Sequence, residues 1–132
     1  MHFELAMLAA SCGLCLIHIV VSSHATSLQR GYRWTASSRD DPVLPLAGMA
    51  GRLERALRNF LETFPVFVAA VFLVYALDRE GTLSRWGTGL YFSSRVVYLL
   101  LYAMGVPLIR SLVWNVAFVG IVLLLLAAFW PG

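Results

Sequence analysis

Four polar side chains recur at helical spacing within residues 52–75. Arg55, Arg58, Asn59 and Glu62 lie at i, i+3, i+4 and i+7, so a helix with about 3.6 residues per turn places them on one face. The stretch then becomes apolar enough to enter a bilayer, where an ionisable group at the helix centre costs about 2.5 to 3.5 kcal/mol. Such groups face a bundle interior or a hydrated cavity. This face therefore predicts a polar site whose guanidinium groups bind carboxylates through paired N–H donors.

A second polar face follows in the next apolar stretch. Tyr91, Arg95, Tyr98 and Tyr102 recur at spacings of four, three and four, which again places them on one side of a helix. Arg95 lies too far from the ends of this stretch to reach water by extending its side chain. Two interpretations stay open: the face lines a polar ligand cavity, or Arg95 pairs with Glu62 and the two charges neutralise each other.

A third candidate lies at the start of the last apolar stretch, where Arg110 and Ser111 follow Pro107. The unpaired amides and the dipole at a helix N-terminus favour anions, and an arginine and a hydroxyl in the same turn add to this preference. Arg110 as a simple headgroup anchor is the alternative. Together, the three faces predict an arginine-rich pocket for a ligand with several carboxylates and one ammonium group, which Glu62 can accept.

The composition indicates an integral membrane protein. Of 132 residues, 60% are hydrophobic and only 13% are charged, against about 25% charged in soluble domains. A spanning helix needs about 20 apolar residues, so we expect a single domain, 1–132, with an all-α fold. It is a bundle of four membrane-spanning helices at 3–21, 55–77, 87–104 and 108–130, with a polar loop at 22–51. A helical extension of the first span up to Gln29 or Arg30 is the alternative for the start of this loop. Pro65 is expected to bend or loosen the second of these helices.

The distribution of arginines predicts the orientation. Seven arginines fall on the side of the loop 22–51 and two on the other side, and positive charge favours the cytoplasmic side. Both termini are therefore expected on the non-cytoplasmic side. The seven are Arg30, Arg33, Arg39, Arg52, Arg55, Arg58 and Arg110, and the two are Arg79 and Arg85.

Several other polar residues have a structural interpretation. Cys12 and Cys15 form a CxxC pair inside an apolar run, with no second pair to complete a zinc site. His18 is expected to pack within the bundle or at its interface, and Glu4 to reach water or a partner at the membrane boundary. Neither a metal site nor a nucleic-acid partner is predicted; the acidic pair at 40–41 is expected in a solvated turn.

Two segments resemble the MAPEG family, the membrane-associated proteins in eicosanoid and glutathione metabolism. ERALRNFLETFPVF, residues 54–67, is similar to that family's second-helix signature, RxxxNxxE. RVVYLLLYAMGVPLIRSLVW, residues 95–114, looks like its third helix, turn and fourth helix, with the pattern RxxYxxxY and a later arginine. The resemblance implies a homotrimer of four-helix subunits that binds glutathione between adjacent subunits near the cytoplasmic surface.

The resemblance also implies a role for each matching residue. Arg110 would stabilise the glutathione thiolate and Ser111 would donate a hydrogen bond to it, so that a lipophilic electrophile or hydroperoxide in the membrane reacts with the sulfur. The residues expected to bind the tripeptide are Arg55, Arg58, Asn59, Glu62, Arg95, Tyr98, Tyr102 and one arginine after the first span, Arg30 or Arg33. Thr63 stands where other members have tyrosine. The alternative is a non-catalytic membrane subunit that binds lipid, pigment or a larger complex.

Overall fold

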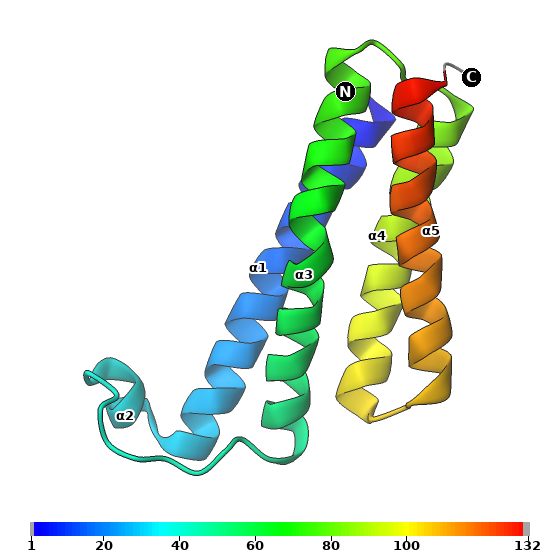
Figure 1. Ribbon diagram of the computed structural model, residues 1–132. Coiled ribbons are helices and arrows are strands. Elements are labelled where there is room, and N and C mark those ends of the chain that lie inside the picture. Colours follow the sequence, from blue (N-terminus) through cyan, green and yellow to red (C-terminus); the bar gives the residue numbers. More distant parts are fainter. Residues whose placement is uncertain (1, 131–132) are drawn as a thin grey trace.

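Four long helices form an antiparallel bundle in the computed structural model of the chain, which describes residues 2–130 (Figure 1). They are α1 (Phe3–Arg30), α3 (Gly48–Ala76), α4 (Thr82–Met104) and α5 (Leu108–Phe129), and the short α2 (Tyr32–Ala36) lies between α1 and α3. The described residues at both ends of the chain meet at one end of the bundle. The segment with α2 and the turn between α4 and α5 lie at the other end (Figure 1).

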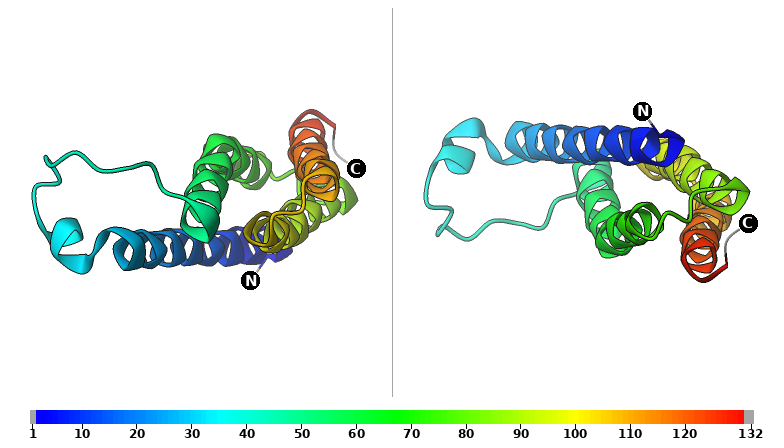
Figure 2. Two further views of the ribbon diagram at one scale, coloured as in Figure 1. Left: turned by 90° about the horizontal axis from the view of Figure 1, so that it is seen from below. Right: turned by 90° about the horizontal axis from the view of Figure 1, so that it is seen from above.

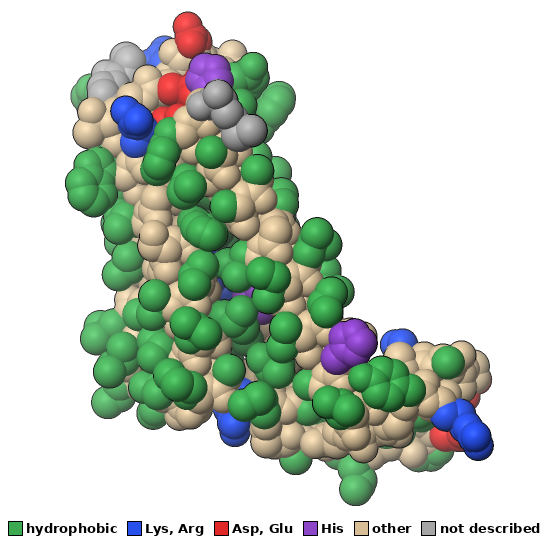
Figure 3. Space-filling view, turned by 180° about the vertical axis from the view of Figure 1, so that it is seen from behind, with side chains coloured by type: hydrophobic (Ala, Val, Ile, Leu, Met, Phe, Trp, Pro, Cys, Tyr) green, Lys and Arg blue, Asp and Glu red, His purple; other side chains and the backbone are tan. Residues whose placement is uncertain are grey.

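Three of the helices, α1, α3 and α5, are long and apolar enough to cross a membrane. The all-helical, multi-pass membrane architecture is therefore confirmed. The predicted span 87–104 falls within α4, which is 23 residues long, or about 35 Å at 1.5 Å per residue. This helix is less apolar because hydroxyl groups, tyrosines and Arg95 occupy its inner face. Hydrophobic side chains cover the length of the bundle in Figure 3, and charged ones gather mainly toward its ends.

The helices extend further than the predicted spans. α1 continues to Arg30 because residues 22–29 contain neither glycine nor proline, and it ends at Gly31, whose φ of 96° favours glycine. The helical extension of the first span up to Gln29 or Arg30 is therefore present, and irregular chain is confined largely to residues 37–47. The side chain of Gln29 bonds the backbone N–H and C=O of Ala47, at 3.0 and 3.1 Å, and so ties the end of α1 to the start of α3.

One further boundary needs correction. α4 begins at Thr82, before residue 87, because the hydroxyl of Ser84 accepts a hydrogen bond from the Gly81 N–H at 2.8 Å and caps the helix. α3 remains helical through Pro65, and the bend expected there stays a prediction. The proline ring is exposed, so it meets no other helix where it interrupts the backbone hydrogen bonding.

The apolar core lies in the half of the bundle that carries the termini. Phe67, Val74, Tyr91 and Leu124 are fully buried there. The rings of Phe67 and Tyr91 stack with their centroids 3.9 Å apart. The core packs α3, α4 and α5 against one another. The polar residues of the same helices lie in the opposite half of the bundle.

Candidate anion-binding site between α3, α4 and α5

Arg95 is the centre of the polar half, and its side chain is fully buried. Its Nη1 donates a hydrogen bond to Oδ1 of Asn59 at 3.0 Å. Its guanidinium lies over the rings of Tyr98 and Phe60, with the Cζ atom 4.4 and 5.3 Å from the two centroids. A neutral amide and two aromatic faces thus hold the cation in place.

Of the two interpretations of Arg95, the ion pair with Glu62 is not formed within residues 2–130. Within residues 2–130 the ion pairs are His2–Glu80 and Arg58–Glu54. Nε and Nη2 of Arg95 are buried and have no hydrogen-bond partner in that part of the chain. A buried charge normally has a counterion, and the described residues supply none for Arg95. Its side chain is enclosed by the chain and does not itself line the cavity described below.

Tyr102 joins the other two polar faces at the end of α4. Its hydroxyl accepts a hydrogen bond from Nε of Arg55 at 3.2 Å. The Cζ atom of Arg110 lies 4.4 Å from the centre of its ring, and Tyr98 meets the ring edge-on at 5.6 Å. Arginines from α3 and α5 therefore converge on one tyrosine of α4.

A cavity of about 210 Å³ opens beside these residues. It is lined by Asn59, Tyr98, Arg110, Ser111, Trp114 and Asn115. The indole N–H of Trp114 is buried without a partner among the described residues, and no described side chain caps the start of α5. The cavity therefore presents mainly hydrogen-bond donors together with a guanidinium, which suits carboxylate or thiolate groups.

Sequence reasoning missed Trp114 and Asn115. Their spacing carried a signal: Trp114 lies four residues after Arg110 and Asn115 four after Ser111, so each shares a helix face with a predicted site residue. The side-chain amide of Asn115 donates to the Ser111 carbonyl at 2.9 Å, which fixes its position along the cavity wall.

Some predicted site residues lie apart from the cavity. Glu62 is exposed on α3. Arg58 is exposed as well and pairs with Glu54 at 2.9 Å. Arg30 donates to the Leu44 carbonyl at 2.9 Å and lines a different pocket, between α1 and α3. A single chain therefore brings arginines of the predicted site together, whereas the predicted carboxylate, Glu62, lies on the outer surface of α3.

Other polar residues are part of the packing. Tyr91 belongs to the core and shares a hydrogen bond with the hydroxyl of Thr63 at 3.1 Å. His18 is buried against the ring of Phe60, with the centroids 4.8 Å apart, as its packed interpretation requires. Of the two alternatives for Glu4, water or a partner, the structure shows a partner: Glu4 is buried and accepts a hydrogen bond from Ser84 at 2.5 Å.

Comparison with known proteins gives one match. The model of the MAPEG family matches residues 7–130, nearly the whole chain, and thus confirms the resemblance seen in two short segments. Searches of curated proteins and of solved structures found no match.

Proposed function

The chain belongs to the MAPEG family, and from this premise we propose that it is a glutathione-dependent membrane transferase or peroxidase acting on lipophilic compounds. A membrane protein of glutathione or eicosanoid metabolism follows from the family alone. The specific activity, the ligand and the residues that bind it are our proposal. It rests mainly on one observation, the buried guanidinium of Arg95 with two unpaired donors and no counterion within residues 2–130.

The available donors fit glutathione, which has two carboxylates and one ammonium group. Arg95 and the indole N–H of Trp114 are buried groups that need an acceptor. Asn59 and Tyr98 hold Arg95 in position, and Arg55 and Tyr102 extend the donor surface toward the end of α4. These contacts support our proposal that the carboxylates bind at the α3–α4 side of the cavity.

Arg110 and Ser111 are placed to act on the sulfur. Glutathione supplies a thiol whose ionised form is a nucleophile. The guanidinium of Arg110, the hydroxyl of Ser111 and the uncapped first turn of α5 all favour a negative charge in the cavity. Their role is to increase the fraction of thiol that is ionised near neutral pH.

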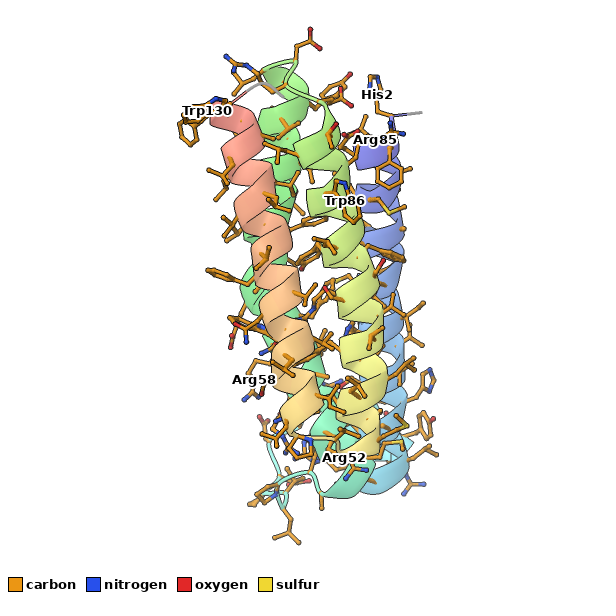
Figure 4. All side chains as sticks on the ribbon, turned by 90° about the vertical axis from the view of Figure 1, so that its right-hand side faces the viewer. His2, Arg52, Arg58, Arg85, Trp86 and Trp130 are labelled. Atoms are coloured by element: carbon orange, nitrogen blue, oxygen red, sulfur yellow. The ribbon has the colours of Figure 1, made fainter. Side chains whose placement is uncertain are left out.

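The exposed position of Glu62 supports a site shared between subunits. An exposed carboxylate on a membrane helix is costly unless another chain covers it, and Glu62 and Arg58 lie on the outer surface of α3. In the homotrimer that we propose, this surface faces the α5 side of a neighbouring copy, and Glu62 accepts the ligand's ammonium group. The arginine-rich end of the bundle, where Arg52 and Arg58 lie in Figure 4, faces the cytoplasm, and both termini lie on the opposite side.

The lipophilic substrate reaches the cavity from the bilayer. Leu112 and Val116, on the same helix as Ser111, are exposed in the single chain, so apolar side chains adjoin the cavity. In the proposed trimer the lipophilic substrate enters along this apolar surface where the neighbouring copy leaves it open to the bilayer. An electrophile or hydroperoxide dissolved in the membrane therefore needs no passage through water to reach the sulfur.

The test measures glutathione binding to the purified chain by calorimetry and the ultraviolet absorbance of the thiolate on binding. Wild type is expected to bind and to show the thiolate signal. Arg110→Ala is expected to keep most of the binding and to lose the signal. Arg85→Gln, which removes an arginine at the opposite end of the bundle (Figure 4), is the matched control and is expected to behave as wild type.

The same measurements distinguish the second candidate function, a non-catalytic membrane subunit. Lack of glutathione binding by wild type would support that candidate and overturn the proposal. Binding without a thiolate signal in wild type would make the chain a receptor for glutathione and not an enzyme.

A further inference from the structure

A groove of about 370 Å³ lies on the outside of the bundle, between the start of α1 and the first half of α4. The residues that line it are Phe3, Arg85, Trp86, Gly89, Leu90 and Ser93. None of them lines the cavity beside Arg110. In Figure 4, Arg85 and Trp86 lie near His2, at the end of the bundle that carries the termini, whereas Figure 2 shows α2 and the following loop extending away from the four long helices. We call this groove the terminal groove; the proposed thiol chemistry gives it no role.

Gly89 leaves open the space that the terminal groove occupies. A Cβ atom added there would have only the ring of Phe3 within 4 Å, at 3.8 Å, so no other helix backbone closes the groove. The α4 residues that line it recur at alternating spacings of one and three, which places them on one helix face. From Arg85 to Ser93 this face rises about 12 Å at 1.5 Å per residue. The groove is therefore parallel to the helix axis, the direction in which acyl chains lie in a bilayer.

Arg85 places a positive charge at the end of the terminal groove. Its Cζ atom lies 5.4 Å from the ring centre of Phe3, and its side chain is exposed. Two carboxylates at the same end of the bundle are not available to it, because Glu4 is buried and Glu80 pairs with His2 at 2.7 Å. Arg85 forms no ion pair within residues 2–130. Its guanidinium can therefore bind an anion from outside the chain.

The terminal groove extends from the headgroup level of a membrane to the level of the acyl chains. Both α1 and α4 begin at this end, and α1 is apolar enough to span a bilayer. Trp86 is exposed next to Arg85, and tryptophan favours the boundary between headgroups and acyl chains. Leu90 continues the apolar wall toward the middle of the bundle. In the trimer proposed above, the copies meet through α3 and α5, which leaves this groove facing the bilayer.

We propose that the terminal groove binds a phospholipid from the membrane leaflet at this end of the bundle. Arg85 donates hydrogen bonds to the phosphate, and one acyl chain lies along Gly89 and Leu90 toward Ser93. A phosphate ester without chains offers the same anion, and a diacylglycerol offers the same chains without the anion. Of the three, only the phospholipid uses both the cation and the apolar walls.

Native mass spectrometry of the full chain in detergent tests the proposal with dioleoyl phosphatidylglycerol as the probe. The ligand controls are dioleoylglycerol, which lacks the phosphate, and glycerol 3-phosphate, which lacks the chains. Arg85→Gln removes the cation, and Gly89→Leu places a side chain in the groove. Both changes spare the buried core, because Arg85 is exposed and a Cβ atom at Gly89 meets only the ring of Phe3.

Each variant has a matched control outside the terminal groove. Arg79→Gln removes the other arginine at this end of the bundle, which does not line the groove. Gly13→Leu adds the same side chain to α1, at a position where nothing lies within 4 Å of a Cβ atom. The two controls separate binding in the groove from general effects of charge and of apolar surface.

Wild type, Arg79→Gln and Gly13→Leu are expected to retain phosphatidylglycerol in preference to both ligand controls. Arg85→Gln is expected to bind the lipid about fivefold more weakly, the contribution of one basic residue near a membrane surface. Gly89→Leu is expected to bind it about tenfold more weakly, since about two methylene groups of the chain lose their apolar contact.

Equal retention by Arg85→Gln and Arg79→Gln would overturn the proposal, because it would indicate lipid that surrounds the protein without a specific site. Equal retention by Gly89→Leu and Gly13→Leu would place the lipid outside the groove and refute it as well. The same holds if dioleoylglycerol is retained as strongly as phosphatidylglycerol, or if glycerol 3-phosphate binds as tightly, because the cation or the apolar walls would then have no role.

Glutathione serves as a competitor in the same experiment. It is expected to leave the bound lipid in place, because its proposed site is at the other end of the bundle. Displacement of the lipid by glutathione would refute the terminal groove as the lipid site. Failure of wild type to bind glutathione at all would concern only the proposed function, so the two proposals fail independently.

Discussion

The two halves of the bundle differ in how their helices meet. In the terminal half, which contains Gly87, Gly120 and the core around Phe67, the backbones of α4 and α5 touch and a cluster of apolar side chains is fully buried. In the turn half, which contains Arg95, Tyr102 and the start of α5, the same helices are separated by aromatic rings, guanidinium groups and a cavity. The difference indicates that the terminal half provides most of the stability, which allows the turn half to hold an unpaired charge for a ligand.

The close contact in the terminal half depends on two glycines. A Cβ atom added at Gly120 would lie 2.6 Å from the carbonyl oxygen of Gly87, and one added at Gly87 would lie 2.7 Å from that of Gly120. Small residues allow membrane helices to approach this closely, and packing then supplies much of their association energy. The rest of α4 and α5 is thereby fixed as well, including the relative positions of Arg95 and Arg110.

Arg95→Met gives the largest expected effect and should move binding and stability in opposite directions. Loss of the buried guanidinium should reduce glutathione affinity by about 2 to 5 kcal/mol, since the ligand's carboxylate loses its charged partner. The free energy of unfolding should stay the same or rise by about 1 to 4 kcal/mol, because an apolar side chain replaces an unmatched buried charge. Calorimetry and equilibrium unfolding in mixed micelles measure the two quantities.

A fall in stability for Arg95→Met would contradict the division between the halves. It would mean that Arg95 supports the fold through its bond to Asn59 and its contacts with Tyr98, as a structural residue would. Arg85→Gln, at the exposed end of α4, controls for the loss of a positive charge.

Gly120→Ala should be the next largest change, with a loss of about 1 to 3 kcal/mol in the free energy of unfolding. The added methyl group meets backbone atoms, which cannot turn aside as a flexible side chain would. Gly13→Ala is the matched control, because nothing lies within 4 Å of a Cβ atom there. It should be neutral or stabilise by up to about 1 kcal/mol through helix propensity. Similar effects of the two substitutions would show that the α4–α5 contact is not close in the membrane.

Thr63→Val tests a single hydrogen bond next to the core. It removes the partner of the Tyr91 hydroxyl, which should cost about 1 to 2 kcal/mol of unfolding free energy because a buried polar group is left unpaired. Glutathione affinity should not change, since Tyr91 belongs to the core and does not line the cavity. The same unfolding and calorimetric measurements apply, and Thr82→Val, at an exposed position, is the control. A loss of affinity would extend the site into the terminal half.

Helical spacing correctly predicted which residues share the inner face of a helix, but it did not predict which residues lie on the outer surface of the bundle. It placed Arg95, Tyr98 and Tyr102 on one side of a helix, and the structure brings them to Arg55, Asn59 and Arg110. Spacing does not say which neighbour a face meets. Glu62 shares a face with Asn59 in sequence yet is exposed, because one helix face is wide enough to cover both the inside of the chain and its outer surface.

Helix ends were also hard to predict, because polar composition does not stop a helix. For residues 22–30 the sequence left a polar loop and a helical extension up to Gln29 or Arg30 both open. The extension forms, because no glycine or proline interrupts these residues before Gly31. The pocket that Arg30 lines between α1 and α3 depends on this extension, which places Arg30 over the indole ring of Trp34.

Tyr102→Phe should have the smallest effect and gives the closest comparison with Thr63→Val, since each removes one hydroxyl hydrogen bond. The substitution deletes the acceptor for Nε of Arg55 but keeps the ring under Arg110. Arg55 and Tyr102 are only partly covered by the chain, so water can replace the lost bond and stability should change by less than about 0.5 kcal/mol. Glutathione affinity should fall by about 0.5 to 1.5 kcal/mol, because Arg55 loses the contact that orients it toward the ligand.

Tyr75→Phe, in the terminal half, should change neither quantity. If Tyr102→Phe lowered stability as much as Thr63→Val does, the turn half would be as tightly packed as the terminal half, and the cavity would not be kept open for a ligand.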